Sequence, residues 1–141
     1  MSIESSTLNL TICNPLYATV DVISFIQPNS KSNGGNGQLC SGGQAVLSIL
    51  IEGCPGATYY LTPAVSTQSG QQPGLSVTLP ASGSLTVGYT TGSISADCFD
   101  GGCLGGCNFT ISVYVWDNSS ENTLLLTSSP SNRIYVDCSC S

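Results

Sequence analysis

Residues 97–117 read D-C-F-D-G-G-C-L-G-G-C-N-F-T-I-S-V-Y-V-W-D. In the second half of this stretch, every odd position from Phe109 to Val115 is apolar, and polar or amphipathic residues stand between them. A period of two residues indicates a β-strand with one face buried in a core. The first half is a glycine-rich loop that holds three cysteines. The stretch therefore predicts a β-fold in which disulfides help to fix a core strand.

The rest of the chain repeats this kind of pattern in short segments. No segment has the period of a helix, and glycine, proline and asparagine mark the turns between the apolar segments. The adjacent apolar pair Val22 and Ile23 interrupts the alternation, which indicates either a bulge or a strand with both faces buried. We expect strands at residues 7–13, 19–26, 45–52, 57–62, 75–79, 85–89, 108–116, 123–127 and 133–138.

This pattern predicts one all-β domain over residues 1–141. Eight or nine short strands with frequent turns are typical of an antiparallel β-sandwich, here stabilised by disulfides. Both an immunoglobulin-like and a jelly-roll topology fit the pattern. Residues 1–13 are a possible N-terminal arm, and their role is considered below.

The charge and the lengths of the apolar runs argue against two functions, nucleic-acid binding and membrane spanning. Charged residues make up 7% of the chain, against about 25% in an average soluble protein. Lys31 and Arg133 are the two basic residues, and the net charge is −6. Two cations cannot neutralise a run of phosphates, so we expect no nucleic-acid partner. No apolar run approaches about 18 residues, so we expect no membrane span.

An even and high number of cysteines predicts structural disulfides in an oxidising compartment. Cys138 and Cys140 are two residues apart in an extended tail, so we expect them to have different partners. Three cysteines share the loop of residues 97–107, so at least one must bond elsewhere, for instance to Cys54 or to the C-terminal pair. Cys13 and the C-terminal pair lie where a bridge to a neighbouring subunit is easy. The predicted disulfide cysteines are Cys13, Cys40, Cys54, Cys98, Cys103, Cys107, Cys138 and Cys140.

Metal binding and catalysis are the rival interpretations. Clustered thiolates could bind a metal, but structural zinc prefers the C-x2-C spacing, which is absent, and the chain has no histidine. Asp97, Asp100 and Asp137 could bind calcium, but their spacing matches no known calcium motif. The missing histidine also removes the commonest general base. We therefore expect no metal, no cofactor, no catalytic residues and no enzymatic activity.

Three glycosylation sequons, which begin at Asn9, Asn108 and Asn118, point to the outside of a cell. Each asparagine falls on a polar strand face or in a turn, so all three are candidate N-glycosylation sites. The first residues, M-S-I-E-S-S, lack the basic and apolar regions of a signal peptide. Together with the cysteines, these features predict an extracellular location, or the surface of a cell, spore or virion.

The N-terminal arm suggests self-assembly. Leu8, Leu10 and Ile12 form an apolar face that could be added as a strand to the open edge of a neighbouring sandwich. The favoured function is therefore a structural subunit of an extracellular surface filament, pilus-like appendage or shell. Such a homopolymer would form by strand addition, by intersubunit disulfides or by both. Alternatively, residues 6–13 are the first strand of their own sheet.

A second function is a secreted binding or adhesion module for carbohydrate or protein. Tyr59, Tyr60, Tyr114 and Trp116 could form an aromatic platform for sugar rings. Ordinary cross-strand pairing on a half-buried face explains the same residues more simply.

Two resemblances bear on these alternatives. The motif E-G-C-P-G-A at residues 52–57, followed by Y-Y-L at residues 59–61, resembles bacterial and archaeal surface modules with an immunoglobulin-like fold. The N-terminal arm, the terminal cysteines and the start without a leader resemble cysteine-linked filament subunits of the spore-appendage kind, which implies a filament. Those subunits typically have paired cysteines in the arm, whereas this arm has Cys13 alone.

Overall fold

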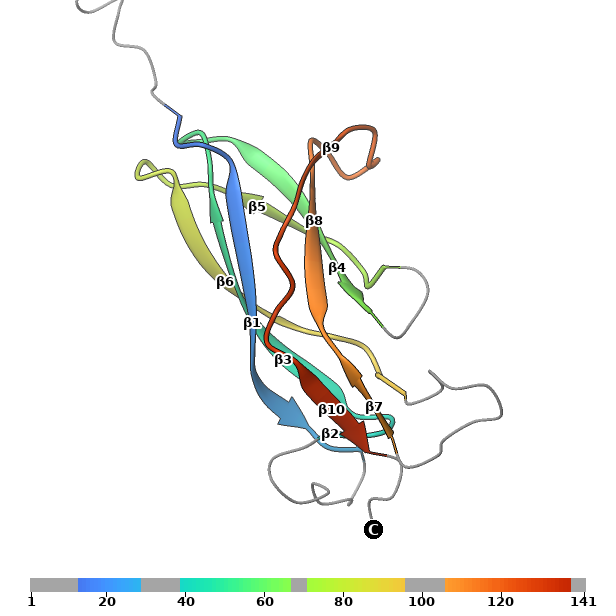
Figure 1. Ribbon diagram of the computed structural model, residues 1–141. Coiled ribbons are helices and arrows are strands. Elements are labelled where there is room, and N and C mark those ends of the chain that lie inside the picture. The colour runs from blue at the N-terminus through green and yellow to red at the C-terminus, as the bar shows by residue number, and fades with distance from the viewer. Residues whose placement is uncertain (1–12, 29–38, 67–70, 96–105, 138–141) are drawn as a thin grey trace, which may run out of the picture.

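The computed structural model describes residues 13–28, 39–66, 71–95 and 106–137 (Figure 1). These ranges contain ten strands and no helix, which confirms the predicted all-β class. The strands are β1 (Tyr17–Ile26), β2 (Leu39–Cys40), β3 (Gln44–Glu52), β4 (Thr58–Val65), β5 (Leu75–Thr78), β6 (Ser84–Thr90), β7 (Gly106–Phe109), β8 (Ile111–Trp116), β9 (Leu124–Thr127) and β10 (Ile134–Asp137).

The strands form two facing layers. One sheet has the order β1-β3-β6 and the other the order β5-β4-β8-β9. A small sheet, β2-β10-β7, extends the second layer at one end, because β7 leads through Thr110 directly into β8 (Figure 1). Within the described ranges, every strand pair is antiparallel except β2 with β10, which is parallel.

The strand order matches the immunoglobulin-like alternative. With β1, β3 and β6 as strands A, B and E, and β4, β8 and β9 as strands C, F and G, the pairing is that of an immunoglobulin-type Greek key. Strand β5 is added beside β4 at the edge of the second sheet. A jelly roll would instead arrange eight strands as two Greek keys.

The core lies between the two sheets and follows the alternation seen in the sequence. Phe109 and the odd-numbered residues of β8 are buried, as predicted. Strand β3 alternates in the same way and lies between β1 and β6. Each fully buried aliphatic side chain contributes roughly 1.5–3 kcal/mol to folding. The inward residues of these central strands are Ala45, Leu47, Ile49, Ile51, Ile111, Val113 and Val115.

Strand β4 is longer than the predicted segment 57–62, because it continues through Pro63 to Val65. The carbonyl of Pro63 accepts a hydrogen bond from the Gln72 N–H, so this edge of the residue faces away from β8. The partner strand β5 pairs only with residues 58–61 of β4. Pro63 therefore sits where no ladder N–H is required, which is where a strand tolerates proline.

Three further differences concern strand boundaries. The predicted strand 108–116 is divided at Thr110 into β7 and β8. Strand β2 lies between the expected strands 19–26 and 45–52, where no strand was expected. Of the two explanations for the pair Val22 and Ile23, the bulge is confirmed and burial of both faces is wrong, since the register of β1 shifts between Val22 and Ser24 and Ile23 is 62% exposed.

Candidate functional site

Two surfaces of the sandwich are candidates for function, and the first lies between β1 and β9. These strands are the outermost strands of their sheets, they contact each other, and neither has a second strand partner in the described chain. We call this region the β1–β9 seam. It consists of the free edges of β1 and β9 together with residues 128–132, from the segment that joins β9 to β10.

One part of the seam is closed by a side chain. The Val22 N–H donates a hydrogen bond to Asn132 Oδ1 at 3.0 Å, and Asn132 Nδ2 donates to the Val22 carbonyl at 3.5 Å. The carboxamide of Asn132 thus takes the place of a neighbouring strand at the point where β1 bulges. Because both polar groups of Val22 are paired, a new strand cannot bond to β1 at this point.

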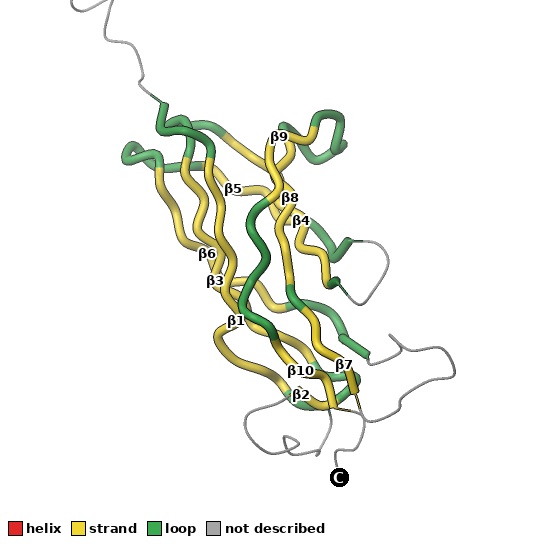
Figure 2. Tube along the Cα trace, in the orientation of Figure 1, coloured by secondary structure: helices red, strands yellow, loops and turns green. Residues whose placement is uncertain are grey.

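Residues 128–133 stay bonded to β8 although they are not part of a strand. Ser128 and Ser131 donate their backbone N–H groups to the carbonyls of Val113 and Ile111 at 2.9 and 2.8 Å. Their hydroxyls accept hydrogen bonds from the N–H groups of the same two residues at 2.8 and 2.9 Å. Figure 2 shows this non-strand segment between β9 and β10, beside β1.

The other part of the seam is open and apolar. Tyr17 at the start of β1 is 49% exposed, and Leu124 and Leu125 in β9 are 45% and 42% exposed. Figure 1 shows both strands beginning at the same end of the sandwich. Unpaired strand edges beside exposed apolar side chains are sites where another strand can add. The arrangement therefore suits strand addition at this end.

The N-terminal residues that the structure describes are anchored at the end where β1 begins. Cys13 forms a disulfide with Cys54, in the turn between β3 and β4. The Asn14 N–H donates to the Gly53 carbonyl at 3.2 Å, and its side chain donates to the Gly83 carbonyl at 3.2 Å. Residues 1–12, with the predicted assembly residues Leu8, Leu10 and Ile12 and the sequon residue Asn9, lie outside the described residues.

The disulfide corrects two expectations about the cysteines. Cys13 is bonded within the chain, so it is not free to bridge a neighbouring subunit, and Cys54 is not the partner of a loop cysteine. Cys40 and Cys107 are also disulfide-bonded, and no described cysteine is free. The predictions for Cys98, Cys103, Cys138 and Cys140 lie outside the described residues, as do Asp97 and Asp100. The described chain holds no group of three metal-ligating side chains.

The aromatic residues do not form one flat platform. Tyr59 is separated from the other three, because it packs against the core and its hydroxyl accepts a hydrogen bond from the Cys54 N–H at 3.2 Å. Tyr114 and Trp116 pack edge to face, with ring centroids 6.3 Å apart. The Trp116 indole N–H donates to Thr62 Oγ1 at 2.9 Å. Tyr114 and Trp116 therefore pack against each other along one strand, β8, and the hydrogen bond to Thr62 ties Trp116 to the neighbouring strand β4.

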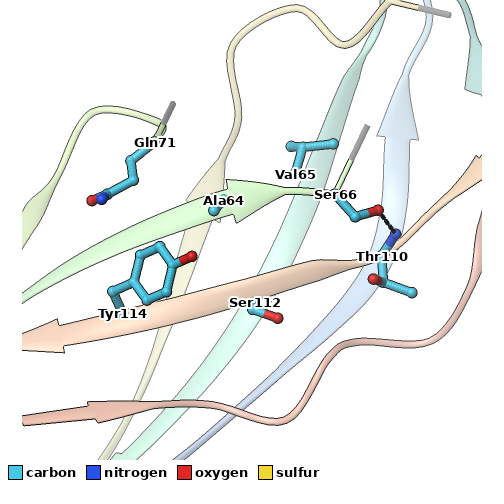
Figure 3. A pocket seen from close by; sticks show the side chains of 7 residues that line it. All are labelled: Ala64, Val65, Ser66, Gln71, Thr110, Ser112 and Tyr114. Carbon is cyan, nitrogen blue, oxygen red and sulfur yellow. Dashed lines mark hydrogen bonds between the residues drawn. The ribbon is translucent and has the colours of Figure 1, made fainter. Parts of the chain in front are cut away.

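The second candidate surface is a hollow on the outer face of β4 and β8, with a volume of about 410 Å³. Figure 3 shows Ala64 and Ser112 in the middle, Tyr114 and Gln71 toward one end, and Ser66 and Thr110 toward the other. Ala64 pairs with Ser112 across the two strands, so small side chains leave space above the sheet. At the far end, the Thr110 N–H donates to Ser66 Oγ at 2.9 Å.

A second hollow of about 330 Å³ adjoins the first, because both are lined by Ser66 and Thr110. Asn108, Phe109 and Arg133 complete its lining. We call the two hollows together the polar trough. The exposed side chain of Arg133 makes no ion pair with any described residue, so the trough carries a free positive charge at one end.

Two sequon asparagines lie in the described chain, and both are exposed. Asn108 lines the polar trough. Asn118 lies in the turn between β8 and β9, where its Oδ1 accepts a hydrogen bond from the Ser120 N–H at 2.9 Å. Both side chains are therefore accessible to solvent at positions where the sequence predicts glycosylation.

Comparison with family models, curated proteins and solved structures finds no match to this chain. Within the described ranges, no helix is long and apolar enough to cross a membrane.

Proposed function

We propose that the protein is a structural subunit of an extracellular filament, pilus-like appendage or shell. In this assembly, residues 6–13 of one copy add as a strand to the β1–β9 seam of the next. The observation that carries the proposal is the open part of the seam, where two unpaired strand edges flank the exposed side chains of Tyr17, Leu124 and Leu125.

The chemistry of the arm complements that of the seam. Leu8, Leu10 and Ile12 recur at every second position, so a strand built from residues 6–13 places them on one face. Hydrogen bonds from the arm's backbone would satisfy a free sheet edge, while its apolar face would cover the exposed leucines of β9. Main-chain bonding gives affinity in this mode of recognition, and alternate side chains give specificity.

The anchor of the arm supports the same proposal. The Cys13–Cys54 bridge and the hydrogen bonds of Asn14 hold the base of the arm at the end where β1 begins. A subunit joined to its neighbour through such an arm is held by a covalent link to the turn after β3, the central strand of its sheet. The low charge of the chain keeps repulsion between packed copies small.

Assembly of the purified full-length chain tests the proposal. Leu124→Asp combined with Leu125→Asp introduces charge at the seam, so we expect electron microscopy and sedimentation to show monomers in place of polymers. Ile23→Asp is the matched control, because Ile23 is also exposed but lies beyond the point closed by Asn132. Polymers that survive the double substitution, with the fold intact by circular dichroism, would contradict assembly through the seam.

Gel analysis separates the covalent from the non-covalent route. If bridges join the subunits, denaturing gels without reductant show a ladder or excluded material, which reductant converts to a band at 14.5 kDa. If strand addition acts alone, the denatured sample runs as a monomer under both conditions although the native sample is polymeric. A native sample that is monomeric under every condition would contradict both routes.

A further inference from the structure

The polar trough has no part in the proposed assembly. It lies on the outer face of β4, β7 and β8, whereas the seam runs along the free edges of β1 and β9. Its volumes of about 410 and 330 Å³ fall within the range of about 300–1,000 Å³ that is usual for small-ligand sites. The trough is therefore large enough to hold a ligand while the seam is occupied.

The lining of the trough selects for a polar ligand. Most small-ligand sites are lined mainly by apolar side chains, but here hydroxyl and amide groups predominate. Hydroxyls and carboxamides both donate and accept hydrogen bonds, which matches the hydroxyl groups of a sugar. Tyr114 adds an aromatic ring with a polar tip at one end. The hydroxyl and amide side chains that line the trough are Ser66, Gln71, Asn108, Thr110 and Ser112.

Arg133 indicates that the polar ligand carries a negative charge. It is one of two basic residues in a chain of net charge −6, and it lies in the trough without a carboxylate partner in the described chain. A guanidinium group binds a carboxylate through two parallel N–H···O bonds, an arrangement that a neutral sugar cannot provide. The negative charge of the rest of the protein opposes binding at long range, but at physiological salt it is screened beyond about 8 Å.

We propose that the polar trough binds an oligosaccharide that carries a carboxylate, such as a uronic-acid or sialic-acid chain. The carboxylate pairs with Arg133, and the neighbouring sugar hydroxyls bond to Ser66 and Thr110, which the two hollows share. The chain then continues over Ala64 and Ser112 toward Tyr114. A subunit of this kind would display an acidic-glycan site at every repeat of a filament.

Calorimetric titration of the full-length, disulfide-intact protein tests this site. The probes are trigalacturonic acid and 3′-sialyllactose, with lactose as the neutral comparison. The protein used carries an unmodified Asn108, checked by mass, because a glycan there would occupy the trough. We expect an acidic probe to bind and lactose to bind at least about tenfold more weakly, with an affinity for the acidic probe that falls as salt is added.

Variants decide whether Arg133 is responsible. We expect Arg133→Gln to weaken binding of the acidic probe by about tenfold or more, and Arg133→Lys to weaken it less. Thr86→Glu on β6 is the matched control, since it changes the net charge by the same amount at an exposed position outside the trough. Equal binding of lactose, no effect of Arg133→Gln, or no binding of either acidic probe would each overturn the proposal.

Discussion

Ser128 and Ser131 show how single hydroxyls hold the seam in place. Both side chains are buried, and each hydroxyl accepts a hydrogen bond from a buried N–H of β8. In a regular strand, backbone carbonyls would accept hydrogen bonds from those N–H groups. Here the serine hydroxyls accept them instead, because residues 128–131 are not in a strand conformation. The two serine hydroxyls therefore replace the carbonyl acceptors that a neighbouring strand would supply to β8.

Replacing either serine by alanine should leave a buried N–H without a partner. For Ser128→Ala the orphaned group is the N–H of Val113, and we expect the free energy of unfolding to fall by about 1–3 kcal/mol. Urea denaturation measures this change, and the exposed Ser129→Ala is the control, expected to change stability by less than about 0.5 kcal/mol. Equal effects of the two substitutions would mean that the hydroxyl of Ser128 does not stabilise the seam.

Tyr89 should make the fold sensitive to alkaline pH. Burial raises the pKa of its phenol above the usual 10.0, with a smaller contribution from Tyr60, and its hydroxyl donates to the Pro73 carbonyl. A folded-state pKa above the unfolded one means that the full stability is present below pH 10 and is lost as pH rises through the folded pKa. In urea denaturation at a series of pH values, we expect the free energy of unfolding to fall above pH 10. The fall should be less steep in the Tyr89→Phe variant, which has no phenol at this position. The same slope in both proteins would contradict this role.

At the residue scale, the sequence predicted burial well and close contacts poorly. The alternation from Phe109 to Val115 named four residues that are all buried. Gly106 was assigned to a loop because glycines and cysteines surround it, yet it begins β7 with a φ of +152°. A Cβ at this position would collide with the carbonyl of Val136, a contact between strands that no local pattern encodes.

At the scale of the element, β1 depends on a distant amide for its edge. Asn132 lies 110 residues from Val22 and pairs with its N–H and carbonyl at the bulge. The pair Val22 and Ile23 indicated either a bulge or burial of both faces, but nothing local to Asn132 identified it as the partner of Val22. A hydrogen bond between residues so far apart in the sequence can be predicted only when the relative positions of the two sheets are known.

Removing this amide should loosen β1 without unfolding the sandwich. For Asn132→Ala we expect a loss of about 1–2 kcal/mol in unfolding free energy, and faster hydrogen exchange at the Val22 N–H than at the amides that pair with β3. Exchange followed by NMR resolves these amides individually. An unchanged exchange rate at Val22 would show that Asn132 does not close the seam.

Strand limits were predicted best where the alternation is regular and worst where a single residue breaks it. Strands β3, β5, β6, β9 and β10 lie within one residue of their predicted bounds. The end of β4 was predicted too early because proline usually marks the end of a strand. Strand β4 tolerates Pro63 because β5 pairs only with residues 58–61 and so requires no N–H at this position. The two-residue β2 is too short to produce any periodicity.

At the scale of the whole molecule, the cysteine count predicted disulfides but not their connectivity. The even number of cysteines is compatible with 105 complete pairings, so the bridge from Cys13 to Cys54 could not be deduced. The composition led us to expect no nucleic-acid partner, but it did not identify a partner that the protein binds. The polar trough escaped prediction because its lining comes from β4, β7, β8 and the segments after β4 and before β10, which only the fold brings together.

The Cys13–Cys54 bridge should stabilise the whole domain. It closes a segment with a sequence separation of 41, which in the chain-entropy model is worth about 4 kcal/mol. We therefore expect Cys13→Ser combined with Cys54→Ser to lower the unfolding free energy by roughly that amount in chemical denaturation, with the other cysteines left unchanged. A loss below about 1 kcal/mol would show that the base of the arm is not anchored through this bridge.

The central claim is that the arm of one copy occupies the seam of the next, and complementation between two blocked full-length chains tests it most directly. One chain carries Leu124→Asp and Leu125→Asp in the seam, and the other carries Leu8→Asp and Leu10→Asp in the arm. Each should be monomeric alone, because every junction needs one intact arm and one intact seam. Mixed in equal amounts, they should sediment as a dimer of about twice 14.5 kDa and no larger species. A mixture that stays monomeric, or a single variant that polymerises alone, would contradict the account.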